Sequence, residues 1–201
     1  MATATASGDG AANAVAYITG ATDTLLLWPE LSIPSTFTIC SVTRFTGGTR
    51  QRILKCSGYG LNWLHGHGGG DRGPVYYDAY MVADGNVGNV DDWLVMCGTN
   101  AGATFPGNII VDQDEIGTAD GGTGGGRLNI NGPDAENSDW ALHSVLIWDY
   151  SLGIVPRNSQ ALTRPWNSQM SRGNMTRCST PQRLAAIERD CCIVVAGQSD
   201  W

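Results

Sequence analysis

The sequence predicts an all-β fold, a two-sheet antiparallel sandwich, from three observations. The 201-residue chain contains 27 glycines and only 15% charged residues, a composition that suits short strands and tight turns better than helices. Runs that alternate between apolar and polar residues recur at short intervals, separated by glycine-rich breaks, and no long helical pattern occurs. Apolar residues make up 42% of the chain, so one domain of this length can bury a core.

The N-terminal residues 1–16 are rich in Ala, Thr and Gly, and we expect them to be a loose, flexible segment. The first clear strand is residues 36–42, which alternates with period two. Residues 46–49, Thr-Gly-Gly-Thr, predict a hairpin turn, with residues 52–56 as the return strand. Further strands are expected at residues 61–65, 74–77, 92–97, 108–111, 127–132 and 138–149. The glycine-rich residues 117–126 are expected to form a mobile loop that joins the sheets.

The pattern changes after Gly153, so we place the sandwich at residues 17–153 and an irregular C-terminal tail at residues 154–201. Thr180 followed by Pro181 is typical of a helix start. The tail is therefore expected to contain a short helix near residues 181–190. Residues 192–196 are either a late strand or an anchor that packs on a partner.

The formal charge is −7, which argues against a nucleic-acid partner, because binding phosphates needs a basic surface. The charge is uneven. Residues 1–150 hold 16 acids and six bases, for a net −10, whereas residues 151–201 hold three acids and six arginines, for a net +3. The tail is either a solvated segment or a basic docking segment. No signal peptide is evident, and the apolar run Leu25–Trp28 is too short to span a membrane.

Six cysteines allow fifteen complete disulfide pairings, and sequence alone does not choose among them. They are Cys40, Cys56, Cys97, Cys178, Cys191 and Cys192. Cys40 and Cys56 flank the expected hairpin, so they either bond across it or remain buried thiols. No Cys-x-x-Cys occurs, which leaves little support for a zinc or dithiol redox site.

Several segments resemble laminin-G-like modules of the concanavalin A-like superfamily, in a variant similar to those in proteins of unicellular algae. They are residues 37–44, 62–67, 76–78, 92–96, 128–132 and 145–149. The resemblance covers roughly residues 35–153. It implies a jelly roll of two curved antiparallel sheets that binds glycans, glycoproteins or calcium through loops at one rim. It ends after the last strand: where the family places Leu-Ser-x-x-Glu-Met, residues 152–157 are Leu-Gly-Ile-Val-Pro-Arg.

The candidate ligand-binding residues are aromatic or histidine side chains of two expected strands: Trp63, His65, His67, Tyr76 and Tyr77. Aromatic rings pack on the C–H faces of sugars, and the two histidines could instead bind a metal or titrate near neutral pH. The alternative is a strand end packed beside a glycine loop. Three tryptophans that alternate with apolar residues are expected in the core: Trp93, Trp140 and Trp148.

The candidate metal ligands are Asp112, Asp114 and Asp120, whose carboxylates are the hard oxygen ligands that calcium prefers. The alternative is a solvated turn between strands. A retaining β-glucanase needs Glu-x-Asp-x-Glu on one strand face, but Glu115 points away from Asp112 and Asp114. No Gly-x-Ser-x-Gly occurs either, so we expect no enzyme.

The function expected from these features is a non-enzymatic binding or adhesion module. It would recognise a glycan or glycoprotein through its rim loops, outside the cell or at its surface, with calcium as the one cofactor considered. The second hypothesis is a structural or linker subunit of a large assembly, tethered to neighbouring subunits by the arginine-bearing tail. A glycoside hydrolase of the β-glucanase type comes last.

Overall fold

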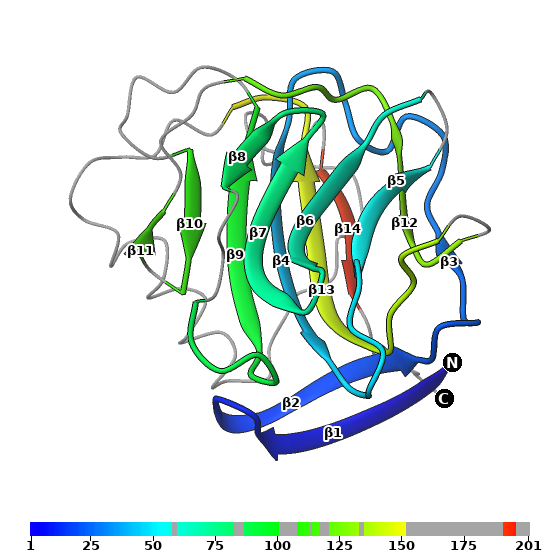
Figure 1. Ribbon diagram of the computed structural model, residues 1–201, viewed down its shortest axis with the longest axis vertical. Helices are drawn as coiled ribbons and strands as arrows, with labels where there is room; N and C mark the ends of the chain where they lie inside the picture. Colours follow the sequence, from blue (N-terminus) through cyan, green and yellow to red (C-terminus); the bar gives the residue numbers. More distant parts are fainter. Residues whose placement is uncertain are drawn as a thin grey trace, which may run out of the picture.

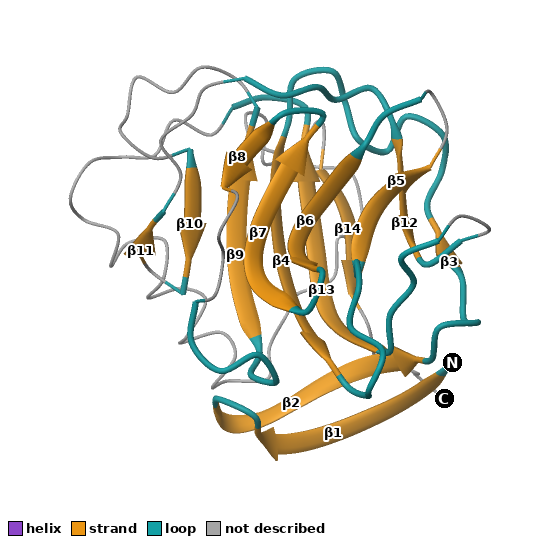
Figure 2. Ribbon diagram, viewed as in Figure 1, coloured by secondary structure: helices purple, strands orange, loops and turns teal. Residues whose placement is uncertain are grey.

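A computed structural model describes residues 1–57, 60–82, 87–100, 108–112, 114–116, 121–132, 135–151 and 191–195, and for residues 57, 80, 81, 114, 115 and 191–195 it describes the backbone alone. These residues form two antiparallel sheets packed face to face (Figures 1 and 2), which confirms the predicted all-β sandwich. Within the described ranges, no helix has the length and apolar character needed to cross a membrane.

The first sheet, sheet A, contains eight of the described strands. Its order is β1 (Ala2–Gly8), β2 (Ala11–Gly20), β13 (Trp140–Trp148), β4 (Thr38–Phe45), β9 (Leu94–Thr99), β10 (Ile109–Val111) and β11 (Asp114–Glu115). A further strand, β14 (Cys191–Val195), also pairs with β13.

The second sheet, sheet B, covers one face of sheet A (Figure 1). Its order is β3 (Leu26–Leu27), β12 (Arg127–Ile130), β5 (Leu54–Ser57), β6 (Trp63–Gly68), β7 (Asp71–Tyr77) and β8 (Tyr80–Val82). Every strand pair in both sheets is antiparallel.

The core lies between the sheets and is built from alternate residues of each strand, as a half-buried strand requires. Sheet A contributes Phe37, Ile39, Phe45, Leu94, Met96, Trp140, Leu142, Val145 and Ile147, and sheet B contributes Leu54, Trp63, Val75, Tyr77, Leu128 and Ile130. Each large apolar side chain buried in this way contributes roughly 1.5–3 kcal/mol relative to exposure. The two inward faces therefore supply the main stabilisation of the fold.

A β-bulge in β13 keeps its apolar residues on one face. Trp140 and Leu142 are two residues apart, but the next core residue, Val145, comes three residues later, and the register with β4 shifts between Leu142 and Ser144. A bulge adds one residue to one strand. The extra residue, His143, therefore lets all of these apolar side chains point at sheet B.

The predicted hairpin over residues 46–49 is wrong. The strand before it, β4, belongs to sheet A, and the strand after it, β5, belongs to sheet B. Both edges of β4 are already paired, with β13 on one side and β9 on the other. Because no edge of β4 remains for β5, the segment between them crosses from one sheet to the other.

The expectation of a loose N-terminus also differs from the structure. Strands β1 and β2 form a hairpin that lies across the lower ends of the other strands in Figure 1. Its turn consists of Gly8, Asp9 and Gly10, all with positive φ. Alternation is weak here because most residues are small, yet Val15 is buried against the outer face of sheet A. That contact holds a segment whose composition alone predicts no structure.

The structure contains a disulfide between Cys40 and Cys97, whose Cα atoms are 4.1 Å apart. The two residues lie directly opposite each other in the β4–β9 register. Of the two alternatives for Cys40 and Cys56, the bond between them is therefore wrong, and Cys56 is buried as the other alternative has it. The premise of that bond was the hairpin, whereas Cys56 lies in the other sheet and faces the core. The predicted helix near residues 181–190 lies outside the described residues.

We predict that losing the Cys40–Cys97 bond lowers the free energy of unfolding by about 2–5 kcal/mol, because the bond joins residues 57 positions apart and restricts the unfolded chain. Urea unfolding with and without reductant measures this. The reductant should have a smaller effect on a Cys40→Ala/Cys97→Ala double variant, which serves as the control. Non-reducing peptide mapping that linked Cys40 to Cys56 instead would contradict the assignment.

Candidate functional site

Four of the five predicted ligand-binding side chains lie in the core. Trp63, His65 and His67 alternate along β6 on the face turned toward sheet A, and Tyr77 of β7 pairs with Trp63. None of the four is more than 1% exposed. Period-two alternation correctly places the three β6 residues on one face, but it does not reveal that this face points inward.

The Tyr77 side chain is the centre of an aromatic stack. The rings of Trp63 and Tyr77 are stacked with centroids 5.0 Å apart, and Phe37 of sheet A meets Tyr77 edge-on at 5.0 Å. The Tyr77 hydroxyl lies 2.7 Å from His65 Nδ1. It extends toward Gly98, where a Cβ atom would come within 2.3 Å of it. Glycine at position 98 therefore makes room for the phenol.

His67 lies two residues after His65 in β6 and is also fully buried. Its Nδ1 is 3.3 Å from the Thr43 hydroxyl oxygen, and its ring meets Phe45 edge-on at 4.6 Å. Burial is the main cause that lowers the pKa of His65 to about 3. Burial, together with the neighbouring Arg72 charge, lowers the pKa of His67 to about 3 as well. Burial also raises the pKa of the Tyr77 phenol.

Both histidines are therefore neutral at neutral pH, and their rings are closed off from solvent. They match the alternative of a strand packed within the fold. The predicted position of Trp63, His65, His67 and Tyr77 on a rim that contacts a ligand is wrong, because the aromatic character that favoured sugar stacking also favours burial.

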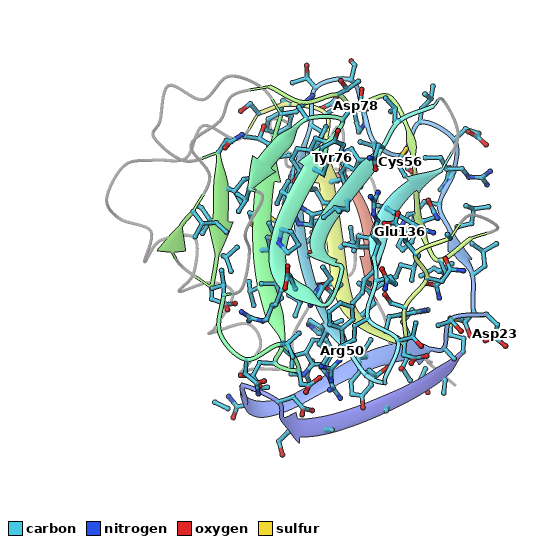
Figure 3. The ribbon with its side chains drawn as sticks, in the orientation of Figure 1. Asp23, Arg50, Cys56, Tyr76, Asp78 and Glu136 are labelled. Atoms are coloured by element: carbon cyan, nitrogen blue, oxygen red, sulfur yellow. A yellow bond between two sulfur atoms is a disulfide. The ribbon has the colours of Figure 1, made fainter. Side chains whose placement is uncertain are left out.

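Tyr76, the fifth predicted residue, points the other way and is partly exposed on the outer face of sheet B. Asp78 follows on the same face, and both lie near the upper end of β7 in Figure 3. Asn62 is exposed next to Asp78: the Asp78 N–H donates to the Asn62 carbonyl at 2.8 Å. We call Arg52, Asn62, Tyr76, Asp78 and Glu136 the Tyr76 surface.

The polar groups of the Tyr76 surface are held in place by one another. The Arg52 guanidinium donates to the Asn62 side-chain oxygen and pairs with Glu136 at 3.0 Å. Asp78 adopts a left-handed backbone conformation, with φ of 59°, which turns the chain sharply after β7. The arrangement combines an aromatic ring with fixed donors and acceptors. These groups can hydrogen-bond a neutral polyhydroxyl ligand.

A second cluster with functional chemistry surrounds Arg72, which is only 3% exposed. Its guanidinium donates to the backbone carbonyls of Asp92, Val87 and Trp93 and pairs with the Asp112 carboxylate at 2.5 Å. Arg72 belongs to sheet B, whereas Trp93 and Asp112 flank strands of sheet A. This arginine therefore ties the sheets together at one end.

Of the three predicted calcium ligands, only Asp112 has a described side chain. Asp112 occupies the turn between β10 and β11, and one of its oxygens accepts from Val95 N–H at 3.0 Å while the other pairs with Arg72. Asp112 therefore does not fit a calcium site unless that pair breaks. The side chain of Asp114 and the whole of Asp120 lie outside what is described. Among the described residues, no group of three or more His, Cys, Asp or Glu side chains is placed to hold a metal.

Sequence reasoning missed a cluster on the outer face of sheet A. The Arg44 guanidinium lies over the rings of both Tyr17 and Trp93, 5.8 and 5.4 Å from their centroids, and pairs with Asp9 at 3.1 Å. Trp93 is buried as expected, in this second hydrophobic cluster. No signal in the sequence links Tyr17 to Trp93, because the N-terminal hairpin was not anticipated.

Comparison with known proteins returns nothing for this chain. No family model matches it, and neither does any curated protein or solved structure.

We predict that Arg72→Met lowers the free energy of unfolding by about 2–4 kcal/mol, because it leaves the half-buried Asp112 carboxylate and three carbonyls without their donor. The matched control is Arg50→Met, since Arg50 forms an equally short but more exposed pair with Asp91. That change should cost about 0–1 kcal/mol. Equal losses in chemical denaturation would show that Arg72 has no special role.

We also predict that stability declines as the pH falls below the unfolded histidine value of 6.5. Between pH 6.5 and about 3, His65 and His67 are protonated in the unfolded chain but remain neutral in the folded chain, where they are buried. Each histidine should therefore cost about 1.4 kcal/mol per pH unit over this range. Urea unfolding from pH 7.5 to 5 measures the slope. His65→Gln and His67→Gln should each reduce it, and an unchanged slope would contradict the prediction.

Proposed function

We propose that the chain is a binding module of the laminin-G-like type, with the jelly-roll connectivity of the concanavalin A-like superfamily, and that it recognises a glycan or glycoprotein. Two findings support the family proposal. The chain is a two-sheet antiparallel sandwich, and the segments that resemble the family fall on its strands. Residues 37–44, 92–96 and 145–149 overlap β4, β9 and β13, which lie side by side in sheet A.

The Tyr76 surface is the observation that carries the glycan proposal. Tyr76 is the only one of the five predicted ligand residues that reaches solvent. Its ring offers an apolar face to a sugar. Asn62 and Asp78, which hydrogen-bond each other, supply a side-chain amide and a carboxylate elsewhere on the Tyr76 surface. In this proposal the ligand binds the outer face of sheet B beside the rim. It does not contact Trp63 or Tyr77, which are buried in the core.

The proposal places the module outside the cell or at its surface, with no catalytic role. The Cys40–Cys97 bond supports this location, since disulfides persist in oxidising compartments. Asp112 forms an ion pair with Arg72, so the proposal does not include a calcium ion. The binding experiment below is run with and without calcium. The alternative of an assembly subunit tethered by the tail, residues 154–201, concerns a segment of which only the backbone of residues 191–195 is described.

We predict that the full chain binds a subset of neutral oligosaccharides on a glycan array. Tyr76→Ala should weaken the best hit at least tenfold, which corresponds to about 1.4 kcal/mol, because the stacking face is lost. Titration calorimetry measures the affinity, and parallel arrays with calcium and with chelator show whether the ion contributes.

The matched control is Tyr150→Ala, because Tyr150 is 41% exposed but lies at the end of sheet A. Its affinity should stay within about twofold of the unmodified chain. Blank arrays in both conditions, or equal losses from the two tyrosine variants, would count against the proposal.

A further inference from the structure

The outermost strands of the two sheets differ sharply in length. Sheet B ends at β3, with two residues, and β8, with three. One end of sheet A is β11, with two residues, while the other is β1, with seven. Short edge strands are a common protection against unwanted pairing with other chains. Strand β14, with five residues, also pairs on one side only, with β13. Among the described strands that pair on one side only, β1 is the longest.

Strand β1 also lacks two other features that protect an edge, charge and proline, although its register with β2 shifts between Ala6 and Gly8. Its residues are Ala2, Thr3, Ala4, Thr5, Ala6, Ser7 and Gly8, with no charge and no proline. One side pairs with β2 over almost the whole length, and within the described residues no strand pairs with the other side. The next acid along the sequence, Asp9, pairs with Arg44. About half of the backbone N–H and C=O groups of β1 therefore point outward, able to pair with another strand.

The sequence of β1 is complementary to itself when two copies run antiparallel. With Thr5 on a two-fold axis, Thr5 faces Thr5, Ala4 faces Ala6 and Thr3 faces Ser7. Methyl groups then meet methyl groups and hydroxyls meet hydroxyls from Thr3 to Ser7, while Ala2 faces Gly8 at the ends. A two-fold interface demands this self-complementarity. This complementarity of β1 with itself favours a second copy of the chain over an unrelated strand from another protein.

We propose that β1 pairs with β1 of a second copy of this chain, joining the two A sheets edge to edge in a symmetric dimer. The interface consists of one strand pair with small side chains. It therefore buries less than the roughly 1,200 Å² of stable interfaces. The dimer is accordingly weak and depends on concentration, with a dissociation constant of roughly 10–100 µM, or about 5.5–7 kcal/mol. This inference does not depend on the glycan proposal.

Sedimentation equilibrium of the full chain from about 5 to 500 µM tests the proposal. We expect the mean mass to rise from monomer toward dimer. Thr5→Lys should keep the chain monomeric, because it places two like charges opposite each other at the axis. Thr5 is exposed, so the fold should tolerate the lysine. The matched control, Thr36→Lys at another exposed threonine, should dimerise normally.

Crosslinking tests the register. Opposed residues in antiparallel strands have Cα atoms about 4.5–5.5 Å apart, within reach of a disulfide. On mild oxidation, Thr5→Cys should therefore give a disulfide between position 5 of one chain and position 5 of the other, detected by mass spectrometry, while Ser7→Cys should not link to itself. A chain that stays monomeric up to about 500 µM would overturn the proposal. So would a dimer that survives Thr5→Lys or gives no link at position 5.

Discussion

The contact on which the two sheets depend is the stack of Trp63 on Tyr77, closed by the edge of Phe37 from sheet A. The Tyr77 phenol can be buried there because His65 Nδ1 provides a hydrogen-bond partner and Gly98 leaves the space. The cost of this arrangement is that two histidines must stay neutral. Aromatic burial between the sheets thus stabilises the fold and also sets its sensitivity to acid.

The segments that join the strands are shaped by the same core. Residues 121–126 cross the end of the sandwich: Thr123 N–H donates to the Tyr77 carbonyl at 2.7 Å, and Gly126 N–H donates to the Ile33 carbonyl. A Cβ at Gly124 would meet the Pro34 carbonyl at 1.9 Å. Glycine is thus required for close approach. The loop expected to be mobile is described from residue 121 onward, and there neighbouring carbonyls accept hydrogen bonds from its backbone.

The sequence predicted the strands of the core well, since alternation depends on the local pleat. It predicted their partners poorly. The wrong hairpin at residues 46–49 arose because two adjacent strands with a glycine turn normally pair, and nothing local shows that β13 and β9 occupy both edges of β4. Trp140 is a core residue as expected, but Trp148 is half-buried on the outer face, because the bulge at His143 reverses the alternation. For the site, the sequence alone does not show which of the adjacent Tyr76 and Tyr77 faces solvent. That depends on which face of β7 packs against sheet A.

The charges of the described residues constrain the chemistry of any ligand. All five of their arginines are held in ion pairs with an Asp or Glu: Arg44, Arg50, Arg52, Arg72 and Arg127. Lys55, the remaining base of this region, is buried and donates to the Ala135 carbonyl and to Asn137. Sulfated or phosphorylated glycans are bound by guanidinium or ammonium groups that face solvent. These six cationic side chains already have partners within the fold, and acids outnumber bases among the described residues. The outer face of sheet B therefore suits a neutral sugar better than an anionic one. Asn62 and Asp78 can hydrogen-bond the hydroxyls of a neutral sugar without charge repulsion.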